Sequence, residues 1–114
     1  MPAYVQPPST WVEIQDKRNE LVSHSVLIFK VCQFYGVTVE DLKSKSKKRE
    51  FVHARYFCWY FLQKVCSLTL VDIGKKFDKH HTTILTGIRD LKDYIKIYPA
   101  IAYEEKLLSS QILN

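Results

Sequence analysis

Apolar residues recur at helical spacing along most of the chain. One face of an α-helix is predicted by four of them at intervals of four, three and four residues, which are Ile84, Ile88, Leu91 and Ile95. We expect this helix to run from about Lys79 to Ile97. Its opposite face points outward and carries hydrogen-bonding side chains, which are Thr82, Thr83, Thr86 and Arg89.

The same spacing predicts the other helices, and no segment shows a persuasive two-residue period of the kind that marks a strand. The predicted helices cover about residues 16–35, a short turn at 39–42, and then 51–66, 69–77 and 100–113. The fold class is therefore all-α, a helix-turn-helix bundle of about five to six helices.

Turn and capping residues separate these segments. Gly36 follows the first helix, at the position where a glycine in the left-handed conformation commonly ends a helix. Thr38 and Asp41 have the spacing of an acidic capping box, and Thr69 and Asp72 repeat it. Each pair predicts the first turn of a helix.

The segment from Phe51 to Cys66 is apolar on nearly all sides, so we expect it to be the central and most buried helix. Aromatic rings in a DNA- or RNA-binding protein also stack on bases. Helical spacing nevertheless favours a core role for the aromatic residues of this segment, which include Phe57, Trp59, Tyr60 and Phe61.

The helices predicted at 69–77 and 79–97 are joined by a tight turn at Asp78 and Lys79, which is typical of a helix-turn-helix. Gly74 stands in the middle of the first of them, where glycine costs about 1 kcal/mol relative to alanine. Close approach of a second helix would favour glycine there. The alternative is an ordinary helical corner without a nucleic-acid role.

Positive charge is concentrated just ahead of the predicted central helix. The net charge is +5 and the sequence pI is about 9.1, which favours an anionic partner. Between residues 43 and 55 a single acid, Glu50, accompanies six cations, which are Lys43, Lys45, Lys47, Lys48, Arg49 and Arg55. Residues 43–49 include no apolar residue, so they form either a basic binding loop or an ordinary solvated loop.

One domain with one core fits a chain of 114 residues. Pro2, Pro7 and Pro8 favour an extended start, and Pro99 is expected to end the long helix. The predicted parts are a partly flexible arm at 1–15, a helix-turn-helix domain at 16–98 and a C-terminal helix at 99–114 that packs on it.

Several classes of function find no support in the residues. No apolar run is long enough to cross a bilayer and the start lacks the regions of a signal peptide, so we expect a cytoplasmic protein without membrane contact. Three cysteines without CxxC spacing favour buried thiols over disulfides or zinc. His80 and His81 have no third metal ligand or catalytic partner at suitable spacing. Three scattered glycines form no phosphate-cradling loop, so we expect no enzyme activity, nucleotide or other cofactor.

Three segments in order carry a resemblance to a known family. Residues 31–42 read VCQFYGVTVEDL, residues 67–77 read SLTLVDIGKKF, and HTTIL follows at 81–85. With the basic loop and the helix between them, they resemble the C-terminal DNA-binding domain (domain IV, Trp-repressor-like) of the bacterial chromosomal replication initiator DnaA. The resemblance covers about residues 24–98. It implies a stand-alone domain, without a motor, that binds double-stranded DNA in replication initiation or its regulation.

The resemblance also implies roles for three groups of residues. The start of the long helix would read the major groove through Lys79, His80, His81, Thr82 and Thr83. The basic loop would reach the minor groove, which attracts cations where A·T-rich sequence narrows it, through Lys45, Lys47, Lys48 and Arg49. Phosphates would be contacted by Arg55, Thr69, Lys75 and Lys76, partly because a helix N-terminus favours anions.

Departures from the family pattern fall on this same surface. His80 stands where the family has an acidic residue, the turn after Phe77 is one residue shorter, and Ala54 stands where a proline is common. The basic loop is rich in lysine, which recognises grooves and guanine edges differently from arginine. The DNA target is therefore either DnaA-box-like or a different site.

Other classes of function are alternatives. A protein-interaction module would imitate the initiator and bind other replication proteins, and it would yield pull-down partners without retaining DNA. A transcriptional regulator would use the same surface on a different DNA site. A helical RNA-binding domain would prefer structured RNA over duplex DNA in competition.

Overall fold

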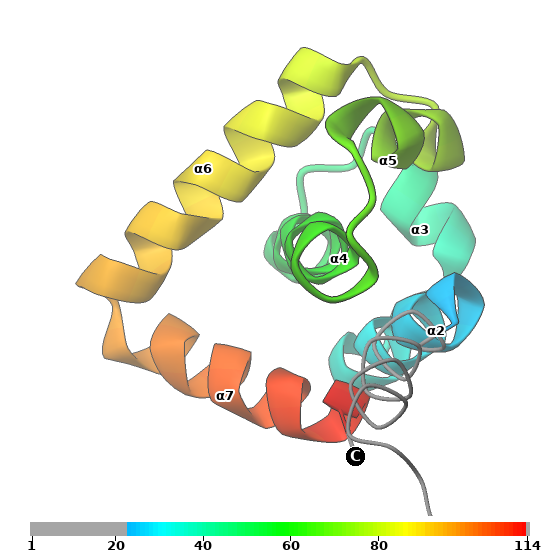
Figure 1. The fold of residues 1–114 in the computed structure, drawn as a ribbon. Helices are drawn as coiled ribbons and strands as arrows, with labels where there is room; N and C mark the ends of the chain where they lie inside the picture. Colours follow the sequence, from blue (N-terminus) through cyan, green and yellow to red (C-terminus); the bar gives the residue numbers. More distant parts are fainter. Residues whose placement is uncertain (1–22, 114) are drawn as a thin grey trace, which may run out of the picture.

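The computed structural model describes residues 23–113, and within them the chain forms six α-helices and no strand (Figure 1). The helices are α2 (His24–Tyr35), α3 (Val39–Lys43), α4 (Arg49–Cys66), α5 (Leu70–Phe77), α6 (His81–Ile97) and α7 (Pro99–Leu113). This confirms the predicted all-α fold class. The predicted arm at 1–15 and the helix start expected near Asp16 lie outside the described residues. No helix in the described range is long and apolar enough to cross a membrane.

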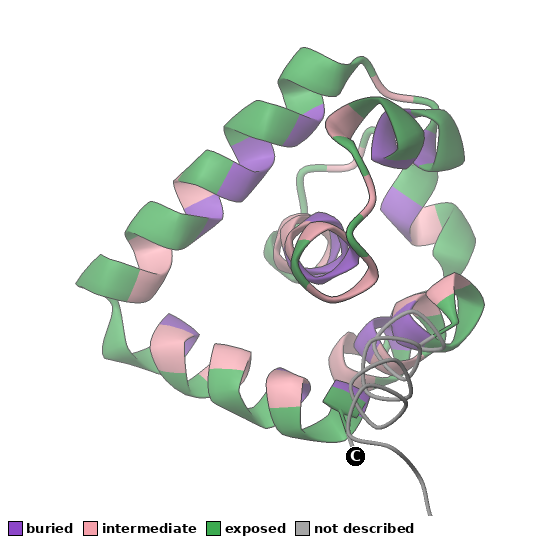
Figure 2. Ribbon diagram, viewed as in Figure 1, coloured by how far each residue is buried: buried purple, intermediate pink, exposed green. Residues whose placement is uncertain are grey.

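Helix α4 is the central helix, as its apolar sequence predicts. Figure 1 shows it end-on with the other helices arranged around it, and it contacts α2, α3, α5 and α6. Figure 2 shows that the surrounding helices turn their buried segments inward. The buried residues of α4 are Ala54, Arg55, Phe57, Cys58, Trp59, Phe61 and Leu62.

The aromatic side chains of α4 form much of the core. The rings of Phe57 and Phe61 stack with centroids 6.0 Å apart, and Trp59 meets Phe77 of α5 edge-on at 6.2 Å. Phe57, Trp59 and Phe61 are at most 1% exposed, while Tyr60 is half-buried. The core interpretation is confirmed for the three buried rings, which have no access to bases.

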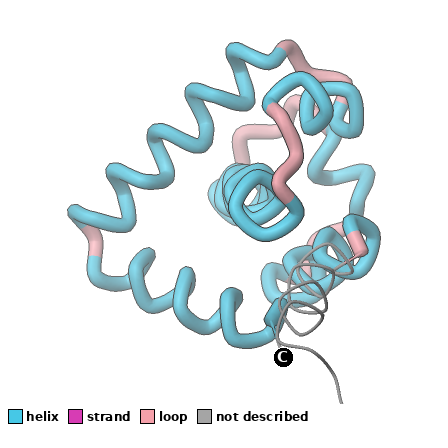
Figure 3. The backbone as a smooth tube through the Cα atoms, in the orientation of Figure 1, coloured by secondary structure: helices cyan, strands magenta, loops and turns pink. Residues whose placement is uncertain are grey.

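Helix α7 closes the arrangement by packing on both α2 and α6 (Figure 3). The Tyr35 hydroxyl of α2 donates a hydrogen bond to Glu104 Oε1 of α7. Burial, together with this hydrogen bond, raises the pKa of Tyr35, so the hydroxyl keeps its proton. Lys64 Nζ of α4 lies 3.5 Å from Glu105 Oε2 of α7 and adds an ion pair at the rim.

Three of the predicted capping positions are confirmed. Gly36 has a left-handed φ of 66° and ends α2. Thr38 Oγ1 accepts the Asp41 N–H at 3.1 Å, and Asp41 Oδ2 accepts the Thr38 N–H at 2.9 Å, which completes a capping box. At the start of α5, Thr69 Oγ1 accepts the Asp72 N–H at 3.1 Å. Only this half of the predicted capping box forms among the described residues, since the Asp72 side chain makes no return bond to the Thr69 N–H. Such caps contribute about 1 kcal/mol each to helix stability.

Several helix boundaries differ from the sequence-based expectation. Helix α4 begins at Arg49, two residues before the expected start at Phe51. Helix α6 begins at His81 rather than near Lys79, because Asp78 adopts a left-handed φ of 55° and His80 is the extended N-cap residue. Helix α7 begins at Pro99 rather than one residue later. A proline is well suited to the first position of a helix, since its missing N–H would have no partner there.

The cysteines lie inside the bundle or at its edge. Cys32 and Cys58 are buried and Cys66 is half-buried. Burial raises the pKa of Cys58 well above its usual range and also raises that of Cys32, with Asp41 as a second cause. The prediction of buried thiols is therefore confirmed for these two residues.

Candidate nucleic-acid interface

Helices α5 and α6 form a helix-turn-helix whose turn consists of Asp78, Lys79 and His80. The Lys79 N–H donates to the Gly74 carbonyl at 2.8 Å and folds the turn back onto α5. A Cβ atom at Gly74 would lie only 2.5 Å from the Lys79 carbonyl oxygen. The glycine is therefore required by close approach of the turn, not by the packing of a second helix that its position first suggested.

The start of α6 presents an exposed polar group of side chains. His80, His81, Thr82 and Thr83 are exposed, while Lys79 in the turn is half-buried. His80 Nδ1 accepts the Thr82 N–H at 3.3 Å and lies 2.8 Å from Thr82 Oγ1. The imidazole rings of His80 and His81 lie with centroids 4.3 Å apart. These contacts hold the first turn of α6 in one arrangement.

A shallow hollow of about 250 Å³ adjoins this first turn, and its lining includes Tyr56 of α4. The other lining residues are Thr82, Thr83, Thr86 and Gly87. Burial, followed by the nearby Asp90 carboxylate, raises the pKa of Tyr56. Sequence reasoning did not single out Tyr56 for the site. The only hint in the sequence was that Tyr56 follows Arg55. Its ring meets Thr82 and Thr83 because α4 and α6 cross at this point.

The cations of α5 lie beside the turn. Lys75 and Lys76 are exposed, and Lys75 lines a hollow of about 400 Å³ together with Lys79, His80 and His81. Thr69 is also exposed, but its hydroxyl oxygen accepts the Asp72 N–H as the cap of α5. The structure thus brings one basic side chain of α5 to the start of α6.

Residues 44–48 form the loop before α4, and turns at its serines shape it. Ser44 Oγ donates to the Asp41 carbonyl at 2.7 Å and accepts the Ser46 N–H at 3.3 Å. The basic residues here are all exposed, namely Lys45, Lys47, Lys48 and Arg49. The loop prediction is confirmed for Lys45, Lys47 and Lys48, whereas Arg49 is the first residue of α4.

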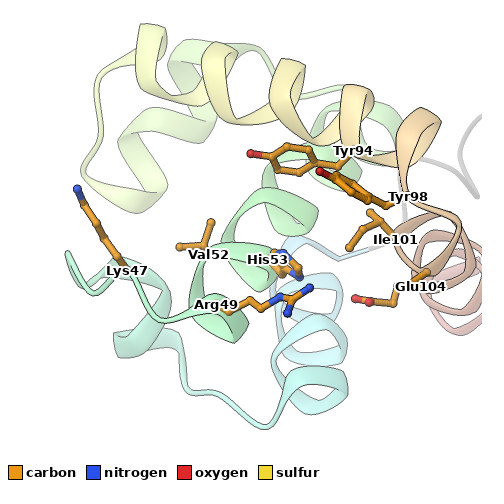
Figure 4. A pocket seen from close by; sticks show the side chains of 9 residues that line it. Lys47, Arg49, Val52, His53, Tyr94, Tyr98, Ile101 and Glu104 are labelled. Carbon is orange, nitrogen blue, oxygen red and sulfur yellow. The ribbon is translucent and has the colours of Figure 1, made fainter.

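The four basic residues do not form one cluster. Figure 4 shows Lys47 extending away from the first turn of α4, while Arg49 turns the other way, toward His53 and Glu104. Lys48 Nζ lies 5.5 Å from the centroid of the Phe51 ring. Lys47 therefore reaches outward from this loop, and it also lines the cleft described next.

Arg49 and His53 line a cleft of about 590 Å³ between the start of α4 and the junction of α6 and α7 (Figure 4). Its other walls include Tyr94, Tyr98 and Glu104. Burial lowers the pKa of His53, Glu104 opposes the shift, and Arg49 adds to it.

Arg55 corrects one expectation from the sequence. It is 8% exposed, so it is not a surface cation available to phosphate. Its Nε donates to the Leu42 carbonyl at 2.8 Å, and its Nη2 donates to the Ser46 carbonyl at 2.9 Å and the Asp41 carbonyl at 3.3 Å. The guanidinium therefore ties the end of α3 and the basic loop to α4. A planar fork of donors suits several carbonyls at once.

Adjacent residues of α4 connect the two halves of the surface. Arg55 holds the basic loop, and Tyr56 borders the hollow beside Thr82 and Thr83. The buried side chains of α4 thus fix where the loop lies relative to the start of α6. Within the described part of the chain no group of three histidine, cysteine or acidic residues is placed to hold a metal ion.

The capped helix α5, the tight turn and the exposed start of α6 define a helix-turn-helix domain. The family described as bacterial DnaA protein helix-turn-helix matches residues 25–91. The chain belongs to this family. The matched region is the helix-turn-helix domain, not a nucleotide-binding motor.

Individual relatives agree with this assignment. The chromosomal replication initiator protein DnaA of Oleidesulfovibrio alaskensis is 30% identical over 76 residues, which cover 67% of this chain and 16% of that protein. The DnaA 1 protein of Chlamydia pneumoniae is 36% identical over 70 residues, 61% of this chain and 15% of the relative. A crystal structure of a DNA replication initiation factor superposes with a TM-score of 0.69 at 26% identity and covers 90% of this chain and 31% of that one. The chain spans less than a fifth of these two curated relatives.

Proposed function

We propose that this protein binds double-stranded DNA in a sequence-specific manner, in a role connected with the initiation of replication or its regulation. The observation that carries the proposal is the start of α6. Four exposed polar side chains, His80, His81, Thr82 and Thr83, project from a helix end that a rigid turn holds in place. In a helix-turn-helix, this end of the second helix enters the major groove.

The first turn of α6 reads base edges in this proposal. A threonine hydroxyl both donates and accepts hydrogen bonds, and its methyl group packs on the methyl of thymine. Histidine adds a ring N–H donor. Lys79 lies at the edge of the same surface and adds a base contact there, and Lys75 beside it contacts phosphate. Relatives named as chromosomal replication initiators support the connection with replication.

The basic loop supplies contacts that depend little on sequence. Lys47 extends outward from it (Figure 4) and reaches the neighbouring minor groove, while Lys45 and Lys48 contact phosphates. Phosphate contacts fix the register and orientation of the protein, and base contacts select the sequence. The lysines of this loop and the threonines of α6 therefore make different contributions.

Selection of bound sequences from a random duplex library tests this division. Thr82→Ala should reduce discrimination among sequences, whereas Lys47→Ala should weaken binding to most sequences alike. A DnaA-box-like consensus would identify the target as the family's own site, and another consensus would assign a different one. If both variants lose affinity without any change in sequence preference, Thr82 does not read bases.

A further inference from the structure

We propose that His80 fixes the Thr82 hydroxyl as a hydrogen-bond acceptor, so that Thr82 selects a base carrying an exocyclic amino group. In the major groove such groups are N6 of adenine and N4 of cytosine. This proposal rests on the proposed function, because it assumes that the start of α6 faces base edges. His80 acts here as a positioning residue through Thr82.

Two contacts made by one ring nitrogen carry the proposal. His80 Nδ1 lies 3.3 Å from the Thr82 backbone nitrogen, with the N–H directed at it. The same nitrogen lies 2.8 Å from Thr82 Oγ1. His80 is the N-cap residue of α6, so this ring nitrogen occupies the place of the usual oxygen acceptor.

The positions of the protons follow from these contacts. A ring nitrogen that accepts a backbone N–H uses its lone pair and carries no hydrogen, so the single ring proton of neutral His80 lies on Nε2. Nδ1 then has nothing to donate to Thr82 Oγ1 at 2.8 Å. In this tautomer the hydroxyl proton of Thr82 points toward Nδ1, whose single lone pair is shared between the two hydrogens.

This arrangement determines what Thr82 offers to DNA. A hydroxyl has one hydrogen and two lone pairs. With the hydrogen directed at His80, only the lone pairs and the methyl group are available outward. Thr82 therefore accepts from an amino group but cannot donate to N7 or O6 of guanine or to O4 of thymine.

Neighbouring side chains restrict this arrangement to Thr82. The His81 ring lies against the His80 ring, with centroids 4.3 Å apart, and restricts its rotation. Thr83 is exposed like Thr82, but within the described residues no side-chain hydrogen bond fixes its hydroxyl, which is therefore a rotor able to donate or accept. Thr83 is an internal comparison for the same chemistry without the histidine.

The test combines the ring of the unbound protein with atoms of the bound base. Long-range proton–nitrogen NMR correlations of His80 should show the proton on Nε2 and none on Nδ1. For DNA, the duplex selected from a random library is remade with purine or pyrimidin-2-one analogues that lack only the amino group. A parallel series uses 7-deazapurines, which lack only the N7 acceptor.

At one position, loss of the amino group should weaken wild-type binding about 3-fold to 10-fold, the range of a single hydrogen bond. Thr82→Ser should show the same loss, whereas Thr82→Val should show none, because it lacks the hydroxyl. His80→Ala frees the hydroxyl to donate as well as accept, so at a purine this variant should become sensitive to the 7-deaza substitution, to which the wild type is not. Thr83→Val, the matched control, should keep the wild-type loss at that position.

Two results would overturn the proposal while leaving DNA binding intact. One is a proton on Nδ1 of His80 in the neutral ring. The other concerns a duplex that the wild type binds tightly. There, the effect of the Thr82 substitutions would depend on the N7 deletion rather than on loss of the amino group, or on neither. Failure of the wild type to bind any duplex would overturn the proposed function, and this inference with it.

Discussion

Gly74 lies where the turn between α5 and α6 folds back onto α5, and the backbone approaches it too closely for any side chain. Sequence reasoning marked this glycine as requiring close approach, because a mid-helix glycine has a cost. The approaching group is the Lys79 carbonyl, which no periodicity predicts. The identity of such a contact depends on the path of the turn.

Gly74→Ala tests this contact. A Cβ atom 2.5 Å from backbone must displace the turn, so the free energy of unfolding should fall by about 1–3 kcal/mol, the usual cost of overpacking. DNA affinity should fall as well, because the turn sets the start of α6. Denaturation and anisotropy on Gly74→Ala measure both effects. Val71→Ala, an exposed position in the same helix, is the control, and equal behaviour of the two variants would refute the contact.

His53 gives a prediction of pH dependence. Burial lowers its pKa in the folded protein, so the unfolded chain binds a proton at higher pH than the folded one. Above the unfolded pKa both states are neutral and no stability is lost. Stability contributed by the neutral ring should fall as the pH drops through about 6.5, the range in which unfolded histidine titrates.

Thermal unfolding of the wild type and of His53→Gln at several pH values measures this effect. The stability of the wild type relative to the variant should decline between about pH 7.5 and pH 5.5. The Arg49 side chain beside the ring acts in the same direction, and Glu104 acts against it. A difference that stays constant or grows in favour of the wild type at acid pH would contradict the assignment.

At the scale of elements, the basic loop owes its position to one buried residue. The sequence predicted the loop from its lack of apolar residues, and the family resemblance implied that Arg55 contacts phosphate. The structure gives the Arg55 side chain three backbone carbonyls instead. Residues 43–55 alone do not show whether Arg55 binds backbone carbonyls or phosphate, because the difference lies in how α3 packs on α4.

Arg55→Lys separates these two roles. Lysine keeps the positive charge but lacks the planar fork that reaches several carbonyls, so the variant should release the loop and expose its amides to faster hydrogen exchange at residues 44–48. DNA affinity should fall several-fold, as in Arg55→Met, while α5 and α6 stay protected. If lysine restored full affinity, Arg55 would act by its charge and not as a clamp.

The helices themselves were the most predictable elements. The capping residues at Thr38 and Thr69 act as the sequence suggested, because a cap is a contact between residues three apart. The start of α6 was misplaced by two residues, since His80 replaces the usual oxygen acceptor at the cap. A cap can be predicted from sequence when the two residues are close along the chain and the acceptor is one of the usual oxygen-bearing side chains.

At the scale of the whole molecule, α4 organises the surface that we propose for DNA. Its apolar sequence predicted a central position, and its buried rings confirm it. The meeting of Tyr56 with the threonines of α6 depends on how two helices cross. That crossing is a property of packing, so the sequence predicted the reading end and the basic loop separately but not the helix that joins them.

The central claim is that this surface binds duplex DNA, and the salt dependence of binding tests it most directly. Each neutralised phosphate lowers log K by about 0.9 per log unit of salt, so about four to six phosphates give a slope of about −4 to −5. Fluorescence anisotropy with the selected duplex should show this slope for the wild type. The slope should be shallower by about one for Lys47→Ala and unchanged for Lys106→Ala, a change at an exposed lysine of α7. A flat salt response, or equal slopes for all three proteins, would contradict the account.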